Sequence, residues 1–165
     1  MRRQTKWIAS VAAFALAAGI GVALLQRQPA PEVRYSTLSG ERFSTSELRG
    51  KVVLVNFWAT TCVTCVKEMP KLIETHKKFA PRGYETVAVA MSYDPPGQVA
   101  EFANSRGLPF KVALDVNGEI ARGFGGVRVT PTSFVLDKRG RILRQFLGEP
   151  DWAAFHALLE EALSE

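Results

Sequence analysis

The fold of this chain is decided by the stretch Val52-Val-Leu-Val-Asn-Phe-Trp-Ala-Thr-Thr-Cys62-Val-Thr-Cys65-Val-Lys-Glu-Met-Pro70. It opens with an apolar and β-branched run that is too short for a helix and typical of a strand buried on both faces. After the second cysteine, apolar residues recur with helical spacing as far as Phe79. The stretch therefore predicts a buried strand, a turn and a helix, with the two cysteines at the start of the helix.

Cys62 and Cys65 are the only cysteines in the chain. Two cysteines placed at random would fall three positions apart only about one time in a hundred, so the pair indicates a dithiol site. At the N-terminus of a helix, unpaired N–H groups and the positive end of the helix dipole favour a thiolate over a thiol. We therefore expect Cys62 to be the attacking nucleophile. Cys65, one turn further into the helix and less accessible, is expected to resolve the mixed disulfide.

Two other uses of the cysteine pair are open. A disulfide that only staples the fold would close a very small loop, and the stabilisation from loop closure grows with loop length. A metal site would need further ligands, and the only histidines are His76 and His156. Neither histidine has ligand spacing with the cysteine pair. His76 is three turns further along the predicted helix, and His156 lies near the C-terminus. The residues therefore favour redox chemistry.

The N-terminal segment has the pattern of a membrane anchor. Residues 7–25 are 19 consecutive uncharged residues, preceded by Arg2, Arg3 and Lys6 and followed by Arg27. A helix of this length rises about 28 Å, close to the hydrocarbon thickness of a bilayer. Because the basic residues lie mainly before the span, we expect a cytoplasmic N-terminus and a C-terminal domain on the other side of the membrane.

A cleaved signal peptide is the alternative to an anchor. Its apolar region is usually shorter, and a small-residue cleavage site follows it. Here Ala-x-Ala matches such as Ala13-Phe-Ala15 lie inside the apolar run, and residues 26–31 form a poor cleavage site. We therefore expect an uncleaved signal anchor over residues 1–27, a short tether over residues 28–31 and a folded domain over residues 32–165. With or without cleavage, the domain lies where disulfide chemistry occurs.

The charge of the folded part gives no support to a nucleic-acid partner. The net charge of +5 arises in the N-terminal segment, since residues 28–165 carry 17 basic against 16 acidic side chains. A nucleic-acid-binding domain needs a basic face of its own. No nucleic-acid partner is therefore expected.

The rest of the chain predicts an α/β domain. Its strand–helix–strand crossovers demand parallel pairing, whereas its final hairpin is antiparallel. A mixed central sheet with helices on both faces is therefore expected. The predicted elements are a hairpin and a capped helical turn within residues 32–50, strands at Val52–Trp58, Tyr84–Met91, Lys111–Leu114, Thr132–Leu136 and Ile142–Phe146, and helices at Cys62–Phe79, Val99–Ser105 and Gly118–Phe124, with a last helix capped by Asp151.

Residues 57–70 resemble the active-site signature of a known family. They read Phe57-Trp58-Ala59-Thr60-Thr61-Cys62-Val63-Thr64-Cys65-Val66-Lys67-Glu68-Met69-Pro70, which is similar to the pattern F-W-A-x-x-C-x-x-C-x-x-E-x-P of membrane-tethered thioredoxin-like proteins of the TlpA/ResA/CcmG group. Thr130-Pro131-Thr132, directly before a predicted strand, resembles the cis-proline segment of the same fold. The resemblance covers residues 32–165 and implies a thioredoxin fold.

The resemblance also implies which residues support the dithiol. A cis bond between Thr130 and Pro131 would leave the preceding backbone free to pair with the extended chain of a substrate. Glu68 could tune the thiols or accept a proton, although a glutamate at this place in a helix is more often solvated. Trp58 is expected to support the site from the core or its rim. No cofactor or metal is implied.

Three features depart from the pattern of thioredoxin and its relatives. Asn56 stands where thioredoxin has a buried acid and cannot take a proton, and Thr61 replaces the tryptophan that usually precedes the first cysteine. The pair Val63-Thr64 lacks the proline common in relatives, so the reduction potential does not carry over. Asp94 is a weak candidate for the second acid that ResA-like and CcmG-like members carry near the active site.

The resulting hypothesis is an enzyme, a thiol–disulfide oxidoreductase of the protein-disulfide reductase type. It would be a single-pass protein of the bacterial inner membrane facing the periplasm, or a soluble periplasmic protein after cleavage. The resemblance implies disulfide-containing client proteins, for example in cytochrome c or oxidase maturation, and a membrane thiol electron donor that re-reduces the dithiol. Two alternatives are a disulfide-forming oxidant of the same fold and a copper carrier that binds Cu(I) through Cys62 and Cys65.

Overall fold

The computed structural model describes residues 27–165, whose centre is a five-stranded sheet with the order β5-β4-β3-β6-β7. Its strands are β3 (Val52–Trp58), β4 (Tyr84–Ala90), β5 (Lys111–Leu114), β6 (Thr132–Leu136) and β7 (Ile142–Leu147). The helices are α2 (Val63–Phe79), α3 (Pro96–Arg106), α4 (Glu119–Gly123) and α5 (Trp152–Ser164). A hairpin of β1 (Arg34–Ser36) and β2 (Arg42–Ser44) precedes the sheet, and the short 3₁₀ helices are η1 (Thr45–Leu48) and η2 (Ala80–Arg82).

The sheet is mixed, as predicted. β3 pairs in parallel with β4, and β4 with β5, whereas β6 runs antiparallel to both β3 and β7. The register aligns the last residues of the three parallel strands, which therefore end at one edge of the sheet. β6 begins and β7 ends at this same edge, because Thr132 pairs with Phe57 and with Leu147. We call this end of the sheet, where β3, β4 and β5 have their last residues, the carboxyl edge; the term does not mean the outermost strands β5 and β7.

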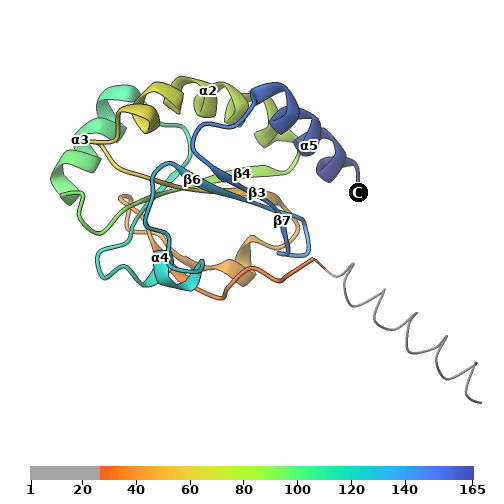
Figure 1. The fold of residues 1–165 in the computed structure, drawn as a ribbon, viewed down its shortest axis with the longest axis horizontal. Coiled ribbons are helices and arrows are strands. Elements are labelled where there is room, and N and C mark those ends of the chain that lie inside the picture. The colour runs from red at the N-terminus through yellow and green to blue at the C-terminus, as the bar shows by residue number, and fades with distance from the viewer. Residues whose placement is uncertain (1–26) are drawn as a thin grey trace, which may run out of the picture.

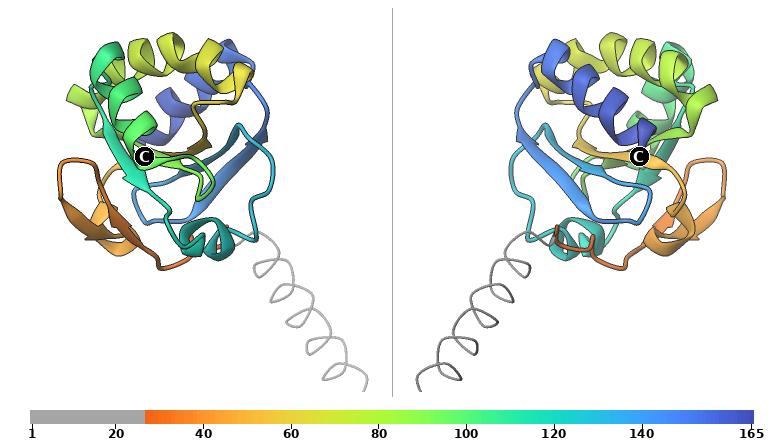
Figure 2. Two further views of the ribbon diagram at one scale, coloured as in Figure 1. Left: turned by 90° about the vertical axis from the view of Figure 1, so that its left-hand side faces the viewer. Right: turned by 90° about the vertical axis from the view of Figure 1, so that its right-hand side faces the viewer.

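Helices cover both faces of the sheet, which confirms the predicted architecture. α2, α3 and α5 lie together on one face, whereas α4 and the β1–β2 hairpin lie on the other (Figures 1 and 2). The crossovers through α2 and α3 step in the same direction along the sheet, from β3 to β4 and from β4 to β5. Crossovers of one hand that step in the same direction place their helices on the same face.

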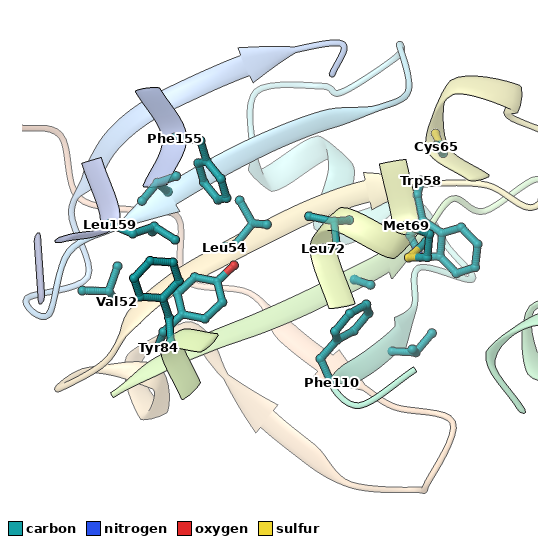
Figure 3. Packing of buried hydrophobic residues seen from close by; sticks show 14 of the residues in the cluster. Val52, Leu54, Trp58, Cys65, Met69, Leu72, Tyr84, Phe110, Phe155 and Leu159 are labelled. Atoms are coloured by element: carbon teal, nitrogen blue, oxygen red, sulfur yellow. The ribbon is translucent and has the colours of Figure 1, made fainter. Parts of the chain in front are cut away.

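Strand β3 is buried along its whole length. Its side chains alternate between two apolar clusters, one beneath α2 and α5 that includes Leu54 and Trp58, the other against α4 and the hairpin that includes Val55 and Phe57. Figure 3 shows the first cluster, in which Trp58 of β3 lies beside Met69 of α2. Asn56 is also fully buried, so its side-chain amide needs hydrogen-bond partners inside the core.

The predicted elements are present, with small shifts at their ends. α2 begins at Val63, with Cys62 as its N-cap. α3 begins at Pro96 rather than at Val99, because proline suits the first turn of a helix. Asp151 caps α5 as predicted, since its Oδ1 accepts a hydrogen bond from the N–H of Ala154 at 2.8 Å.

Residues 28–30, part of the predicted tether, pair with the β6–β7 turn. The N–H of Ile142 donates to the carbonyl oxygen of Gln28 at 2.8 Å, and the N–H of Ala30 donates to that of Gly140 at 2.9 Å. The chain therefore enters the domain at the β6–β7 turn, which lies at the end of the strands opposite the carboxyl edge. The predicted transmembrane helix lies outside the described residues, and no helix within residues 27–165 is long and apolar enough to cross a bilayer.

Candidate active site

The two cysteines lie at the carboxyl edge, where β3 is followed by α2. The structure has them as a disulfide, with their Cα atoms 5.2 Å apart. The Sγ of Cys62, the N-cap of α2, accepts a hydrogen bond from the backbone N–H of Cys65 at 3.2 Å. The first turn of α2 contains no acidic residue, so its unpaired N–H groups and helix dipole favour a thiolate at Cys62 after reduction. Cys62 is half-buried, whereas Cys65 is fully buried in the apolar cluster.

The segment that begins β6 lies beside the strand that leads to the dithiol. Its Thr130-Pro131 peptide bond is cis, which confirms the prediction. The next residue, Thr132, pairs with Phe57 at the end of β3. The carbonyl oxygen of Pro131 accepts a hydrogen bond from the N–H of Gly148 at 2.8 Å, which holds the β7–α5 loop against this segment.

Glu68 is buried, so the expectation that a glutamate at this place is usually solvated is wrong for this chain. Its side chain is 1% exposed, and its Oε1 accepts a hydrogen bond from Asn56 Nδ2 at 3.1 Å. The same Nδ2 donates to Ser133 Oγ at 2.9 Å. Within residues 27–165, Glu68 Oε2 and Asn56 Oδ1 have no hydrogen-bond partner. The network joins β3, α2 and β6 one helical turn beyond Cys65.

Burial is the main reason why the pKa of Glu68 is raised from 4.5 to about 7. The hydrogen bond from Asn56 opposes this shift in pKa, and the charge of Glu149 adds to it. Glu149 is held at the β7–α5 loop by Trp152, whose Nε1 donates to its Oε1 at 2.9 Å, and its Oε2 lies 3.8 Å from Lys67 Nζ. A carboxyl group with a pKa near 7 changes its protonation state at physiological pH, which suits proton exchange with a thiol.

Asp94 is a site residue that the sequence marks only weakly. It is buried, and both of its carboxylate oxygens accept hydrogen bonds from Thr60. Oδ2 accepts from the backbone N–H and Oδ1 from the hydroxyl group, each at 2.6 Å. Thr60 lies two residues before Cys62, so Asp94 fixes the loop from which the half-buried cysteine emerges. Neither the sequence around Thr60 nor the sequence around Asp94 carries a signal for this hydrogen bonding.

Trp58 lies in the core and not on the surface of the site. It is fully buried, and its ring centroid lies 5.2 Å from that of Phe102 in α3. A client protein could not touch it. Of the roles expected for Trp58, support of the site from the core is the one that its position allows.

The two histidines take part in packing and hydrogen bonding away from the dithiol. His76 Nδ1 lies 3.3 Å from Thr86 Oγ1, and His156 Nε2 lies 2.9 Å from Thr75 Oγ1. Burial lowers the pKa of each ring. In the part of the chain that the structure describes, no group of three or more His, Cys, Asp or Glu side chains is arranged to hold a metal ion.

Fold and site together define a class of protein, the thioredoxin-fold thiol–disulfide oxidoreductases. The defining features are the dithiol at the N-terminus of the helix after the central strand, the cis-proline before the neighbouring antiparallel strand, and the final hairpin followed by a helix. Interconversion of dithiol and disulfide is the chemistry that this arrangement serves.

Comparisons with known proteins agree with this class. The family model described as Redoxin matches residues 25–161. The thiol-disulfide oxidoreductase ResA of Bacillus thuringiensis (strain Al Hakam) is 38% identical over 120 residues, which are 73% of this chain and 68% of that protein. The thioredoxin-like protein YneN of Bacillus subtilis (strain 168) is 32% identical over 149 residues, which are 83% of this chain and 86% of that protein. The chain belongs to the redoxin family of thioredoxin-like thiol–disulfide oxidoreductases and is a relative of ResA.

Solved structures support the same assignment. A putative thioredoxin from Neisseria meningitidis superposes with a TM-score of 0.78 at 35% identity, covering 85% of this chain and 93% of that chain. A putative thiol:disulfide interchange protein DsbE from Chlorobium tepidum superposes with a TM-score of 0.76 at 29% identity, covering 84% and 97%.

Proposed function

We propose that this protein reduces disulfides of exported client proteins, with Cys62 as the nucleophile and Cys65 as the resolving cysteine. The observation that supports these roles best is the difference in exposure between the two cysteines. Cys62 is half-buried at the N-terminus of α2, whereas Cys65 is fully buried. An attacking thiolate needs access to a client, whereas a resolving thiol only needs to reach the sulfur of its neighbour.

The exchange has two steps. In the dithiol form, the Cys62 thiolate attacks one sulfur of a client disulfide, and the other client sulfur leaves as a thiolate that takes up a proton. Cys65 then gives up its proton and attacks Cys62 Sγ, which releases the second client sulfur as a thiol. The client gains two electrons and two protons, and the protein is left with the Cys62–Cys65 disulfide that the structure contains.

Glu68 is the group that we assign to take the proton from Cys65 in the second step. The two residues lie one turn apart on α2, and both are buried. The pKa of Glu68, raised to about 7, allows its carboxylate to accept a proton and later release it at neutral pH. Asn56 and Ser133 act as positioning residues, since the amide of Asn56 bonds to both side chains.

Thr130 and Pro131 are the proposed contacts for the client chain beside its disulfide. They precede β6 at the carboxyl edge, next to the strand that leads to Cys62. An extended client segment would add to the backbone there in the manner of an extra strand. Trp58 would support this surface from below without touching the client.

We also propose that residues 1–27 anchor the protein in the bacterial inner membrane, with the domain in the periplasm. The long uncharged run of residues 7–25 after basic residues supports this topology. Because residues 28–30 pair with the β6–β7 turn, the dithiol would face away from the bilayer. The family resemblance favours clients in cytochrome c or oxidase maturation and a membrane thiol donor that restores the dithiol.

The reduction potential of the Cys62–Cys65 pair tests the direction of electron flow. A potential well below about −200 mV is expected for a reductant, whereas one near −120 mV would assign the protein to disulfide formation. Equilibration with glutathione buffers of known potential, followed by alkylation of free thiols and mass spectrometry, measures it.

A further inference from the structure

The end of the domain opposite the carboxyl edge carries a surplus of basic side chains. We call it the entry end, because residues 27–30 join the domain there. It is formed by the starts of β3 and β4 with the residues before them, the β6–β7 turn and the last turns of α2 and α5. The C-terminus and residue 27 lie at this same side of the domain (Figure 1).

Ion pairs at the entry end neutralise nearly all of its acids. They are Lys51–Glu85, Arg141–Asp137, Arg27–Asp137, Arg27–Glu165, Lys78–Glu160 and Arg82–Glu160. Within residues 27–165, the basic side chains of this end that form no ion pair are Arg49, Lys77, Lys138 and Arg139, against Glu161 among the acids. Glu47, in the neighbouring η1, accepts a hydrogen bond from the N–H of Ser44 at 2.7 Å. A net positive charge therefore remains at the entry end.

Three of these unpaired bases lie together around the β6–β7 turn. The N–H of Gly50, the residue after Arg49, donates to the carbonyl oxygen of Lys138 at 2.8 Å. Asp137 Oδ1 accepts a hydrogen bond from the N–H of Arg139 at 2.9 Å, which fixes the backbone of the turn. Arg49, Lys138 and Arg139 are therefore held close together before any ligand binds, and a preorganised site loses less entropy on binding.

Very little chain separates this turn from the proposed membrane span. The uncharged run ends at Leu25, and the carbonyl oxygen of Gln28 already accepts a hydrogen bond from Ile142. Three residues reach only about 10 Å when fully extended. The headgroup layer on each side of a bilayer is about 6 Å thick. If residues 7–25 span the hydrocarbon, the turn therefore lies at or just above the lipid phosphates.

We propose that the entry end docks on the headgroups of anionic phospholipids through Arg49, Lys138 and Arg139, and so holds the domain upright on the membrane. The proposal rests on the anchor that forms part of the proposed function, because the anchor brings the turn to the bilayer surface. An arginine guanidinium binds two oxygens of a phosphate group, and a lysine binds phosphate as a point charge. Basic residues next to a membrane span are attracted to anionic lipids in this way.

The carboxyl edge offers an anionic bilayer no comparable surface. Its exposed charged residues are Lys67, Arg122, Arg128, Glu119, Glu149 and Asp151, in which bases and acids balance. The buried acids Asp94 and Asp115 lie at the same edge. The two ends of the domain therefore differ in charge, although residues 28–165 are nearly neutral as a whole.

Docking at the entry end would set the height of the dithiol above the membrane. β3 runs from one end of the domain to the other and has seven residues, which span about 23 Å. Cys62 follows this strand and would therefore stand more than 20 Å above the lipid phosphates, open to exported clients. A membrane thiol donor would have to reach it with a part that extends well beyond the bilayer.

The test uses the full chain, in its disulfide form, in lipid nanodiscs. One set of nanodiscs contains phosphatidylcholine, and the other an equal mixture of phosphatidylcholine and phosphatidylglycerol. A fluorophore is attached to Val116→Cys, a position at the carboxyl edge that is 65% exposed, and energy transfer to a headgroup-labelled lipid is measured. The test variant is Arg49→Gln/Arg139→Gln, whose two side chains are exposed. The matched control is Arg122→Gln/Arg128→Gln, which removes the same charge at the carboxyl edge.

We expect less energy transfer in the anionic nanodiscs than in the neutral ones, because docking holds Val116 away from the lipid. Fluorescence lifetimes give the ratio of docked to undocked domains. This ratio should fall roughly fivefold for each base removed in Arg49→Gln/Arg139→Gln, and the control should keep the wild-type ratio. In about 1 M potassium chloride the Debye length is about 3 Å, so the wild type should lose its preference for the anionic lipid.

The possible failures are distinguishable. Equal energy transfer in the two kinds of nanodisc, or equal ratios in the two double variants, would overturn the docking surface and leave the proposed function standing. Release of the protein from bacterial membranes by alkaline carbonate would remove the anchor and the docking surface with it. None of these readouts involves thiol exchange. A chain that reduces no disulfide but shows the expected lipid dependence would therefore support docking and contradict the proposed reductase function.

Discussion

Asn56 and Glu68 share a hydrogen bond inside the core, with Asn56 Nδ2 lying 3.1 Å from Glu68 Oε1. The amide cannot take a proton, whereas the carboxyl group can. The buried acid therefore stands on α2, whereas the strand position at which thioredoxin has a buried acid is Asn56. The pair therefore keeps a titratable group in the core although the strand position is neutral.

The buried carboxyl group makes the stability of the disulfide form depend on pH. The pKa of Glu68 is 4.5 in an unfolded chain and about 7 in the folded one, mainly because of burial. Below pH 4.5 the group is neutral in both states and has no effect. As the pH rises from 4.5 to 7, only the unfolded state loses the proton, so the free energy of unfolding falls by up to about 3 kcal/mol and stays lower above pH 7.

Glu68→Gln removes this titration. The variant should therefore gain stability relative to the wild type as the pH rises. We expect the difference in the free energy of unfolding, variant minus wild type, to be larger at pH 8 than at pH 5 by up to about 3 kcal/mol. Urea denaturation of the disulfide forms at the two pH values measures it. The matched control is Glu74→Gln, an exposed position on the same helix. Identical pH dependence of wild type and Glu68→Gln would contradict the raised pKa.

Glu149 is expected to act on Glu68 through its charge. Because that charge raises the pKa of Glu68, Glu149→Gln should lower the pKa, while the glutamine oxygen can still accept the bond from Trp152. A ¹³C NMR titration of the Glu68 carboxyl carbon measures the change. Glu160→Gln, which removes an acid paired with Arg82 elsewhere on the surface, is the control. Equal titration midpoints of Glu68 in Glu149→Gln and Glu160→Gln would rule out an effect of the Glu149 charge on the pKa of Glu68.

Asp94 is expected to hold the loop before Cys62. Asp94→Ala leaves the part-buried N–H and hydroxyl donors of Thr60 without their acceptors, which costs about 1–3 kcal/mol of stability. Hydrogen exchange of the backbone amide of Thr60 should become faster, and Asp94→Asn, which keeps one carbonyl acceptor, should lie between. Asp151→Ala removes the N-cap of α5 and should destabilise the protein by about 1 kcal/mol without faster exchange at Thr60. Unchanged exchange in Asp94→Ala would show that the loop is held by other contacts.

Local patterns were sufficient to predict most of the fold. The run Val52–Trp58, the glycine and proline breaks and the spacing of apolar residues in helices are determined by neighbours in sequence, and the strands and helices follow them closely. The dithiol could be predicted for the same reason. The two cysteines are close in sequence, and helix geometry alone decides which one is buried.

The rest of the site depends on contacts between distant residues. Glu68 is buried beside Asn56, which also donates to Ser133, 77 positions further along the chain. A helical pattern cannot show this, since an isolated glutamate on a helix is usually solvated. The bond between Asp94 and Thr60 spans 34 positions and likewise leaves no periodic signal. The burial of these two acids therefore depends on how distant segments of the chain pack together.

The assignment of nucleophile and resolving cysteine is tested most directly by trapping mixed disulfides. Cys65→Ser and Cys62→Ser variants of the full chain are expressed in cells, free thiols are alkylated in acid, and disulfide-linked adducts are separated by non-reducing electrophoresis and identified by mass spectrometry. We predict that Cys65→Ser accumulates client adducts through Cys62, because no thiol remains to resolve them, and that Cys62→Ser accumulates none, because Cys65 is buried. Equal trapping by the two variants, or trapping by Cys62→Ser alone, would contradict the assignment.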